Sequence, residues 1–500
     1  MKLTTTRTVK EARGFLYEFL NDGTVAVVGG NPGLVGKQEI PSHFEGYPVV
    51  KIGRGAFSSS HLTEIIIPST VEEICDGAFY WNTLLTEVRI STGVSVIGDR
   101  AFAACPNIKT ISFPPSLKSV GELAFHKCIN LSKVNFNNGL ETIGDFAFGG
   151  CPALKQVLIP ESVTEIGKSV FFDCERLMSI SLPESFLKLS DGLFYKCTSL
   201  ENISLPEKLE IIGQWAFKDC TNLTTITIPG FVYDIGTQAF DGCTSLTEIS
   251  VLPVNSHYNT WKGALFSNDM KKMFRCPEGI KGSYEIPEGV ERVKKGAFDN
   301  CSKLTSVSIP LSLKEIKGSA FYGCSKLSKI TVKSSNTFFT TNDDMLFSKD
   351  MTKLIRCLGS KRKKIEIPES VTEIDEFAFA GCAKLETVKI PESVNVIGEN
   401  AFEGCIGLIN ISLPDSLTEI SSRLFFGCKN LVSVRLPSNL VKIGDHAFDG
   451  CKQLKHISIP STVKQIGHWA FSGCQCLQQA EEVDSSGDSD RPAGSSIFES

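Results

Sequence analysis

The sequence predicts a β-rich repeat solenoid, in which short coils of one pattern stack along the chain. Three observations support this prediction: a motif returns every 23 residues, apolar and polar side chains alternate over only a few positions in each copy, and glycine and proline keep fixed places. The copy at residues 211–229 reads I-I-G-Q-W-A-F-K-D-C-T-N-L-T-T-I-T-I-P. Nearly the whole chain is built from variants of this unit.

Each part of the unit predicts a local structure. A fixed period of this length with leucine and isoleucine at set offsets is typical of a leucine-rich repeat. Ile226 and Ile228 alternate with Thr225 and Thr227, which predicts a short β-strand with one buried face. Stacked coils would join these strands into a parallel sheet with a spacing of about 4.8 Å. Pro229 ends the strand because it has no N–H to donate.

The Ala-Phe step predicts the main apolar core. Glycine at position 213 and its equivalents permits a tight bend, after which a small residue and a large ring turn inward. The ring recurs with the period of the repeat, so the rings of successive coils should form a column. These phenylalanines are Phe102, Phe125, Phe148, Phe171, Phe194, Phe217 and Phe240.

A hairpin precedes the repeats. Residues 15–20 and 24–28 are strand-like runs on either side of Asn21-Asp22-Gly23, a typical hairpin turn. A solenoid needs its open end covered, so we expect this segment to cap the first coil.

Two insertions interrupt the plain repeat. The interval between successive core phenylalanines widens twice, from Phe240 to Phe298 and from Phe321 to Phe379. Matched segments at 265–270 and 346–351 lie within these wider intervals, and they predict two inserted hairpins that turn at 268–269 and 349–350.

These boundaries divide the chain into five segments. We expect an N-terminal cap at 1–50, a repeat block at 51–253, repeats with two hairpin insertions at 254–368, a second repeat block at 369–476 and a disordered acidic tail at 477–500.

Cysteine occupies one position of the repeat, and three interpretations of it remain open. A ladder of disulfides is compatible with the spacing of neighbouring coils, but equivalent side chains in a parallel stack point the same way. A buried small thiol that bonds weakly to the backbone is the structural alternative, which we favour because Ser60 and Asn82 replace the cysteine in the first two coils. Zinc binding at Cys474-Gln475-Cys476 is a third. The predicted structural ladder comprises Cys105, Cys128, Cys151, Cys174, Cys197, Cys220, Cys243, Cys301, Cys324, Cys382, Cys405, Cys428, Cys451 and Cys474.

The pattern I-G-x-x-A-F-x-x-C-x-x-L-x-x-I-x-I-P, with its L-F-S-x-D insertions, resembles the BspA-type leucine-rich repeat family over about residues 15–476. The resemblance implies a leucine-rich-repeat fold. It also implies an adhesin, because relatives are often microbial or protist surface proteins that bind host or extracellular-matrix proteins. No signal peptide, membrane anchor or sorting tail of the kind found in secreted members is visible in these residues, so we do not expect conventional secretion.

Charge and hydropathy restrict the partners. The net charge of −5 over 500 residues is too small to attract nucleic acid. The sequence contains no run of 18 or more apolar residues, so we expect no membrane insertion. Residues 1–11 lack the apolar core of a signal peptide, so we expect a cytoplasmic location, with the cell surface by an unrecognised route as the alternative. A monomer is expected.

The sequence contains no phosphate-binding loop, H-E-x-x-H helix or nucleophile elbow. We therefore expect a non-catalytic protein without a cofactor, and an enzyme whose site is assembled across coils is a distant alternative. The expected function is binding of other proteins through the solenoid surface, either as an interaction scaffold or as an adhesin. Exposed aromatic side chains are frequent anchors of such interfaces. The candidates beside the Ala-Phe step are Tyr80, Trp81, Phe146, Tyr195, Trp215, Phe377 and Trp469.

Overall fold

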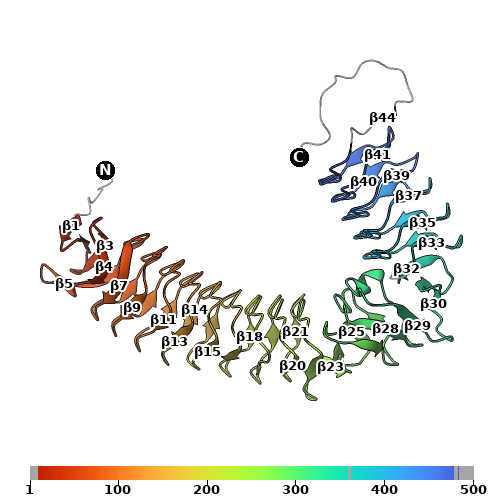
Figure 1. Cartoon of the computed structure of the whole chain (residues 1–500). Coiled ribbons are helices and arrows are strands. Elements are labelled where there is room, and N and C mark those ends of the chain that lie inside the picture. The colour runs from red at the N-terminus through yellow and green to blue at the C-terminus, as the bar shows by residue number, and fades with distance from the viewer. Residues whose placement is uncertain (1–8, 359–361, 478–481, 484–500) are drawn as a thin grey trace, which may run out of the picture. The chain divides into compact units, whose positions relative to one another are not determined.

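The computed structural model describes residues 9–358, 362–477 and 482–483. It confirms the predicted β-solenoid of repeated coils (Figure 1). The single helical element in these ranges is a 3₁₀ turn, η1 (Gly318–Phe321). The chain forms two compact units, Met1–Gly263 and Ala264–Ser500.

The strand that the sequence predicts in each coil is present. β20 (Thr225–Ile228) has alternating exposed and buried residues, and it pairs in parallel with β22 (Glu248–Val251) so that Ile226 lies opposite Ile249. Burial of one face explains why the threonines and isoleucines alternate. We call the strands at this position the first ladder. In the first unit they are β4 (Val35–Glu39), β7 (His61–Ile67), β9 (Glu87–Ile90), β11 (Thr110–Ser112), β13 (Lys133–Asn135), β15 (Gln156–Leu158), β17 (Ser179–Ser181), β20 and β22, followed by β23 (Tyr258–Trp261).

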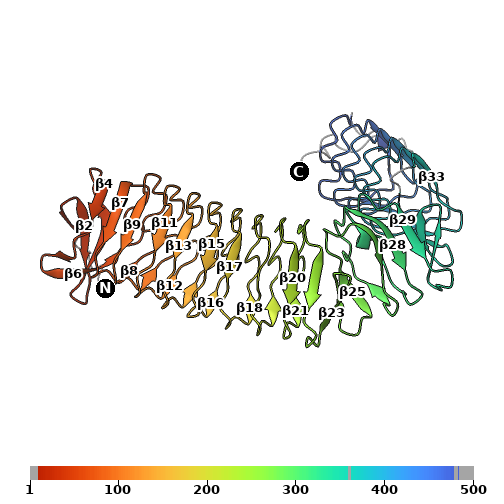
Figure 2. The ribbon, with the colours of Figure 1, turned by 60° about the horizontal axis from the view of Figure 1, so that its bottom comes forward.

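A second row of short strands, which the sequence did not predict, lies just before the position that glycine occupies in most coils, and Figure 2 shows both rows in the first unit. We call it the second ladder. It is parallel and keeps equivalent residues opposite each other, as in Val96↔Ser119 and Ile97↔Val120. Its members in the first unit are β6 (Tyr47–Ile52), β8 (Glu73–Ile74), β10 (Val96–Ile97), β12 (Ser119–Val120), β14 (Thr142–Ile143), β16 (Glu165–Ile166), β18 (Lys188–Leu189), β19 (Ile211–Ile212) and β21 (Asp234–Ile235).

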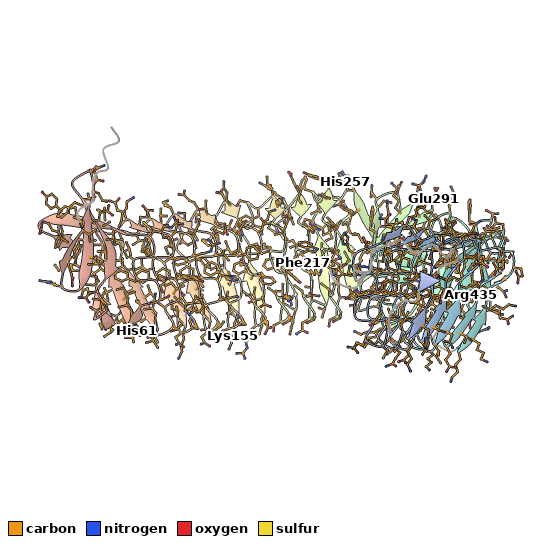
Figure 3. The ribbon with its side chains drawn as sticks, turned by 90° about the horizontal axis from the view of Figure 1, so that it is seen from above. His61, Lys155, Phe217, His257, Glu291 and Arg435 are labelled. Atoms are coloured by element: carbon orange, nitrogen blue, oxygen red, sulfur yellow. The ribbon has the colours of Figure 1, made fainter. Side chains whose placement is uncertain are left out.

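The core between the two ladders is the predicted column of phenylalanine rings. Phe217 is fully buried, and its ring lies 5.5 Å from that of Phe194 and 5.8 Å from that of Phe240, nearly parallel to both. Figure 3 shows Phe217 inside the stack, whereas His61 and Lys155 project from one side of it. The column is therefore a continuous apolar spine within the first unit.

Glycine after the second ladder suits the close approach of neighbouring coils, although Ser190 and Ser421 occupy the same position and donate from Oγ to Ile166 and Ile397 of the preceding coil. A Cβ at Gly213 would lie 2.6 Å from the carbonyl oxygen of Leu189 and 2.7 Å from the amide nitrogen of Asp191, both backbone atoms of the preceding coil. Asp375 occupies the equivalent place where the preceding neighbour is a hairpin strand, and its N–H still donates to Leu354. The glycine thus reflects coil stacking and not a left-handed backbone conformation.

The predicted N-terminal hairpin is confirmed. β2 (Phe15–Phe19) and β3 (Val25–Gly30) are antiparallel on either side of the Asp22-Gly23 turn, and β1 (Val9–Ala12) extends them. β3 then pairs in parallel with β6, and β5 (His43–Phe44) pairs with β6 in turn. The hairpin therefore covers the first end of the second ladder.

Both predicted inserted hairpins are also present, in the second unit. β24 (Ala264–Ser267) and β25 (Lys272–Arg275) are antiparallel, as are β30 (Phe339–Asn342), β31 (Met345–Ser348) and β32 (Lys353–Cys357). β25 and β32 continue as members of the second ladder, pairing in parallel with β27 (Arg292–Val293) and β34 (Glu373–Ile374). The insertion is thus built into the solenoid and does not project from it as a separate loop.

The remaining strands of the second unit repeat the two-ladder arrangement. In the first ladder they are β26 (Gly282–Glu285), β28 (Leu304–Ile309), β29 (Lys329–Val332), β33 (Lys364–Glu366), β35 (Thr387–Lys389), β37 (Asn410–Ser412), β39 (Ser433–Arg435), β41 (His456–Ile457) and β42 (Ile459–Pro460). In the second ladder they are β36 (Val396–Ile397), β38 (Glu419–Ile420), β40 (Lys442–Ile443) and β43 (Gln465–Ile466). Within the acidic tail, β44 (Glu482–Val483) pairs with β42, and residues 478–481 and 484–500 lie outside the described residues.

Candidate protein-binding surface

The corner of each coil, residues 213–220 and their equivalents, holds all seven aromatic candidates. Two residues in a corner have a left-handed backbone, one directly before the alanine and one directly before the cysteine. In one copy these are Trp215 and Asp219, with φ of 58° and 59°. Left-handed residues reverse the chain within a few positions. The reversal turns the side chain at the first of these positions away from the core.

The first unit gathers three of the candidates, Phe146, Tyr195 and Trp215, into one row. Phe172 lies between two of them, with its ring 6.1 Å from Phe146 and 5.2 Å from Tyr195. His126 extends the row, 6.4 Å from Phe146. We call His126, Phe146, Phe172, Tyr195 and Trp215 the aromatic ridge.

Two lysines hold the ridge together electrostatically. The Lys196 ammonium lies 5.5 Å from the centre of the Tyr195 ring and 5.8 Å from that of Phe172. The Lys218 ammonium lies 5.7 Å from the Tyr195 ring and 5.8 Å from the Trp215 ring. Each such cation–π contact contributes about 0.5–1 kcal/mol at an exposed site. The ridge therefore presents rings and positive charge side by side.

Trp215 is the most accessible member of the ridge and is already fixed in place. Its side chain is 40% exposed, and its indole Nε1 donates to Gln238 Oε1 at 2.8 Å. Burial and the neighbouring Lys127 lower the pKa of His126, so this end of the ridge is uncharged at neutral pH. The charge of the ridge thus comes from its lysines.

The other four candidates are not members of the ridge. Tyr80 and Trp81 contact each other edge to face at 6.0 Å, and Tyr80 lines a hollow of about 300 Å³ with Arg54 and Asp99. In the second unit, Phe377 packs on Tyr322 at 5.2 Å, and Trp469 packs on His446 at 5.1 Å.

Phe172 and His126 are ridge residues that the sequence pattern did not single out. Both stand directly after a core phenylalanine, the position that Tyr80 and Tyr195 also occupy. That shared position was a signal for Phe172. His126 stands at the same position, but its place in the ridge depends on its distance from Phe146, which the sequence does not give.

The cysteine ladder lies inside the corners. All eighteen cysteines are free thiols. Twelve ladder cysteines donate from Sγ to the carbonyl oxygen of the core phenylalanine in the preceding coil at 3.0–3.3 Å, as Cys220 does to Phe194. The remaining two ladder cysteines, Cys301 and Cys382, donate instead to the carbonyl oxygens of Cys276 and Cys357. Asn82 makes the equivalent bond to Phe57 with its amide at 2.7 Å, so the ladder position supplies a donor from the next coil to a carbonyl that also accepts a backbone N–H of its own coil, as Phe57 does from Ser60.

The ladder thiols are expected to resist disulfide reagents at about pH 8. Burial raises the pKa of Cys105 and of Cys174 to about 12, so the reactive thiolate is negligible at that pH. In the native protein, the partly exposed Cys476 should react first with dithiobis(nitrobenzoate), whereas Cys75, whose pKa burial raises to about 11, should react slowly. Peptide mass spectrometry identifies the labelled residues. All eighteen should react in denaturant, and fast native labelling of Cys220 would contradict the burial argument.

No group of three or more His, Cys, Asp or Glu side chains suited to a metal ion occurs in the part of the chain that the structure describes. In the same residues, no helix is long and apolar enough to cross a membrane. The described features are repeated coils, their two ladders and their corners. They define the class of protein as a leucine-rich-repeat β-solenoid.

The particular family follows from comparison with known sequences. Residues 50–178, 164–282, 272–355 and 357–478 match the family described as the BspA type leucine rich repeat region, and the chain belongs to this family. Comparison with curated proteins returned no match.

Two solved structures illustrate the similarity. One is a leucine rich cell surface protein from Faecalibacterium prausnitzii A2-165, with 26% identity, 96% of this chain and 95% of that chain covered, and a TM-score of 0.38. The other is a leucine-rich repeat protein from Bacteroides ovatus, with 29% identity, 92% of this chain and 99% of that chain covered, and a TM-score of 0.42.

Proposed function

We propose that the chain is a non-catalytic interaction scaffold whose first unit binds another protein through the aromatic ridge. The observation that carries this proposal is the row of rings from His126 to Trp215 with Lys196 and Lys218 against it. Tryptophan and tyrosine are enriched among the residues that dominate binding energy at protein interfaces.

The dimensions of the ridge suit a protein partner. Together with Gln238 it extends over the coils whose core rings run from Phe125 to Phe240, and a coil spacing of about 4.8 Å gives a length of roughly 24 Å. A stable interface covers about 800 Å² on each partner, which corresponds to a patch about 28 Å wide. The ridge is therefore nearly as long as a typical interface is wide. Because Gln238 and Lys218 already hold Trp215, little side-chain entropy is lost on binding.

Replacing Trp215 by asparagine should weaken partner binding by at least about tenfold without changing the melting temperature. Asparagine suits the test because it adopts the left-handed backbone at this position at a lower cost than alanine does. Trp81→Asn is a matched control: Trp81 has the same φ of 58°, is 55% exposed and lies outside the ridge.

The measurement is affinity capture from extracts of the source cells with the wild type and both variants, quantified by mass spectrometry. Each recovered protein is then titrated in purified form. A direct binder that is retained by Trp81→Asn and lost with Trp215→Asn supports the proposal. Equal affinities for all three proteins would remove the ridge as the binding site, and turnover of a substrate by the purified chain would contradict the non-catalytic assignment.

The adhesin alternative is the same binding function performed at the cell surface. Protease treatment of intact source cells, followed by mass spectrometry of released peptides, separates the two. Release of repeat-loop peptides without lysis supports the adhesin. Recovery of the intact chain only in the soluble lysate supports an intracellular scaffold.

A further inference from the structure

The two inserted hairpins end in an arginine whose surroundings differ between the copies. In the first copy, Arg275 Nη1 donates to the carbonyl of Gly296 at 3.1 Å, and its Nη2 donates to the buried carboxylate of Glu278 at 2.7 Å. In the second copy, Arg356 occupies the matching position and keeps the first contact, with the carbonyl of Phe377. The duplicated arginines therefore share one bond and differ in the second.

The second copy has no acid at this place. When the two copies are aligned on their arginines, Gly359 stands in the sequence where the first copy has Glu278, and Gly359 lies outside the described residues. Arg356 Nη2 donates to the carbonyl of Ala380 at 3.0 Å, and Nε is buried without a hydrogen-bond partner. Among the described residues no Asp or Glu forms an ion pair with Arg356, although its side chain is more than nine-tenths buried. A buried cation compensated only by carbonyl dipoles is costly.

A cavity of about 270 Å³ lies against this arginine. The end of β32 separates two corners here, and Cys382 donates to the carbonyl of Cys357 at 3.7 Å, as Cys301 does to that of Cys276, whereas the other twelve ladder cysteines donate to a core phenylalanine. A cysteine side chain in the place of a phenylalanine leaves room. The cavity is lined by the apolar Leu327 and Leu358 and by the exposed Lys384.

We propose that this cavity binds a small aliphatic carboxylate, whose head group supplies to Arg356 the negative charge that Glu278 supplies to Arg275. A planar carboxylate matches the guanidinium group, as the first copy demonstrates within the same chain. The leucines accept the short hydrocarbon tail. The volume is near the lower end of ligand pockets, roughly 300 Å³, which favours a small free acid. This site is in the second unit and is independent of the aromatic ridge.

Isothermal titration of the full chain with sodium propionate at about pH 7, with sodium sulfate at equal ionic strength as the comparison anion, tests the proposal. We expect saturable binding of one propionate per chain and weaker binding of sulfate. Arg356→Gln should weaken propionate binding by at least about tenfold, because a charge-assisted hydrogen bond is lost.

Because Arg356→Gln also removes bonds to two backbone carbonyls, a second variant keeps the test independent of folding. Ala383→Phe places a ring at the exposed rim of the cavity and should abolish binding with an unchanged melting temperature. Ser302→Phe, at the equivalent position of the first copy, is the matched control and should bind as the wild type does. The proposal is overturned if the wild type shows no saturable propionate binding, if sulfate binds as tightly, or if Ala383→Phe binds normally.

Discussion

Replacing Phe217 by alanine is expected to lower the free energy of unfolding of the first unit by about 3–5 kcal/mol. The ring is fully buried and stacks between Phe194 and Phe240. Its removal leaves a cavity that neighbouring coils cannot fill, because the ladders fix their spacing on both sides. Since each coil packs only on its neighbours, the loss also weakens coupling along the unit.

Urea unfolding followed by circular dichroism measures this effect, and hydrogen exchange of the amides in residues 211–235 locates it. Phe231→Ala is the matched control, because Phe231 is in the next coil and 66% exposed. We expect that variant to change the free energy by less than about 0.5 kcal/mol. Equal unfolding curves for the Phe217 variant and the wild type would show that the phenylalanine column does not support the fold.

Asn336→Ala is expected to destabilise the second unit by at least about 3 kcal/mol. The Asn336 amide is buried at the start of the second insertion and is bonded through both its nitrogen and its oxygen. Its Nδ2 donates to the carbonyls of Pro310 at 2.8 Å and Leu313 at 3.3 Å, and its Oδ1 accepts from the N–H groups of Phe338 and Phe339 at 2.8 Å. Alanine leaves these backbone groups unsatisfied. The side chain thus fastens the hairpin to the preceding coil.

The same arrangement occurs in the first insertion, where Asn255 donates to Pro229 and Val232 and accepts from His257 and Tyr258. Asn137, in a plain coil, donates to the equivalent carbonyls of Pro114 and Leu117, but its Oδ1 has no hydrogen-bond partner. The bonds accepted by the oxygen are therefore what the two inserted hairpins share.

Thermal and urea unfolding of Asn336→Ala, Asn336→Asp and the control Asn342→Ala test the assignment. Asn336→Asp keeps the oxygen that accepts hydrogen bonds from two N–H groups and loses the donating nitrogen. The free energy of unfolding of Asn336→Asp should therefore differ from that of Asn336→Ala. Asn342 is exposed on β30, and its replacement should be nearly neutral. A neutral Asn336→Ala would mean that the hairpin is held by its apolar residues alone.

Local patterns predicted those parts of the fold that repeat. The alternation around Ile226, the Asp22-Gly23 turn and the matched segments at 265–270 and 346–351 each carry their own signal, and all three predictions are confirmed. The second ladder was missed because a strand as short as β10 cannot show an alternation. Its existence depends on hydrogen bonds to the neighbouring coil.

The candidate surface was predictable only in part. Exposure of Trp215 follows from its place in the repeat, and the period places Gln238 at the same position of the next coil, but only the structure shows that the indole donates to the Gln238 amide and that Lys218 lies against the ring. Phe172 joins Phe146 to Tyr195 only through stacking of three coils. The seven aromatic candidates remain predictions as binding residues.

By itself, the sequence determined that this protein is a stack of similar coils with a column of phenylalanine and a ladder of cysteine, because a period is a property of the chain and needs no knowledge of contacts. Only the tertiary structure decided which corner side chains meet and which carbonyls of the next coil the duplicated arginines reach. Stacking brings together residues that are about one coil or more apart in the sequence, and the distance between two side chains then depends on how neighbouring coils pack.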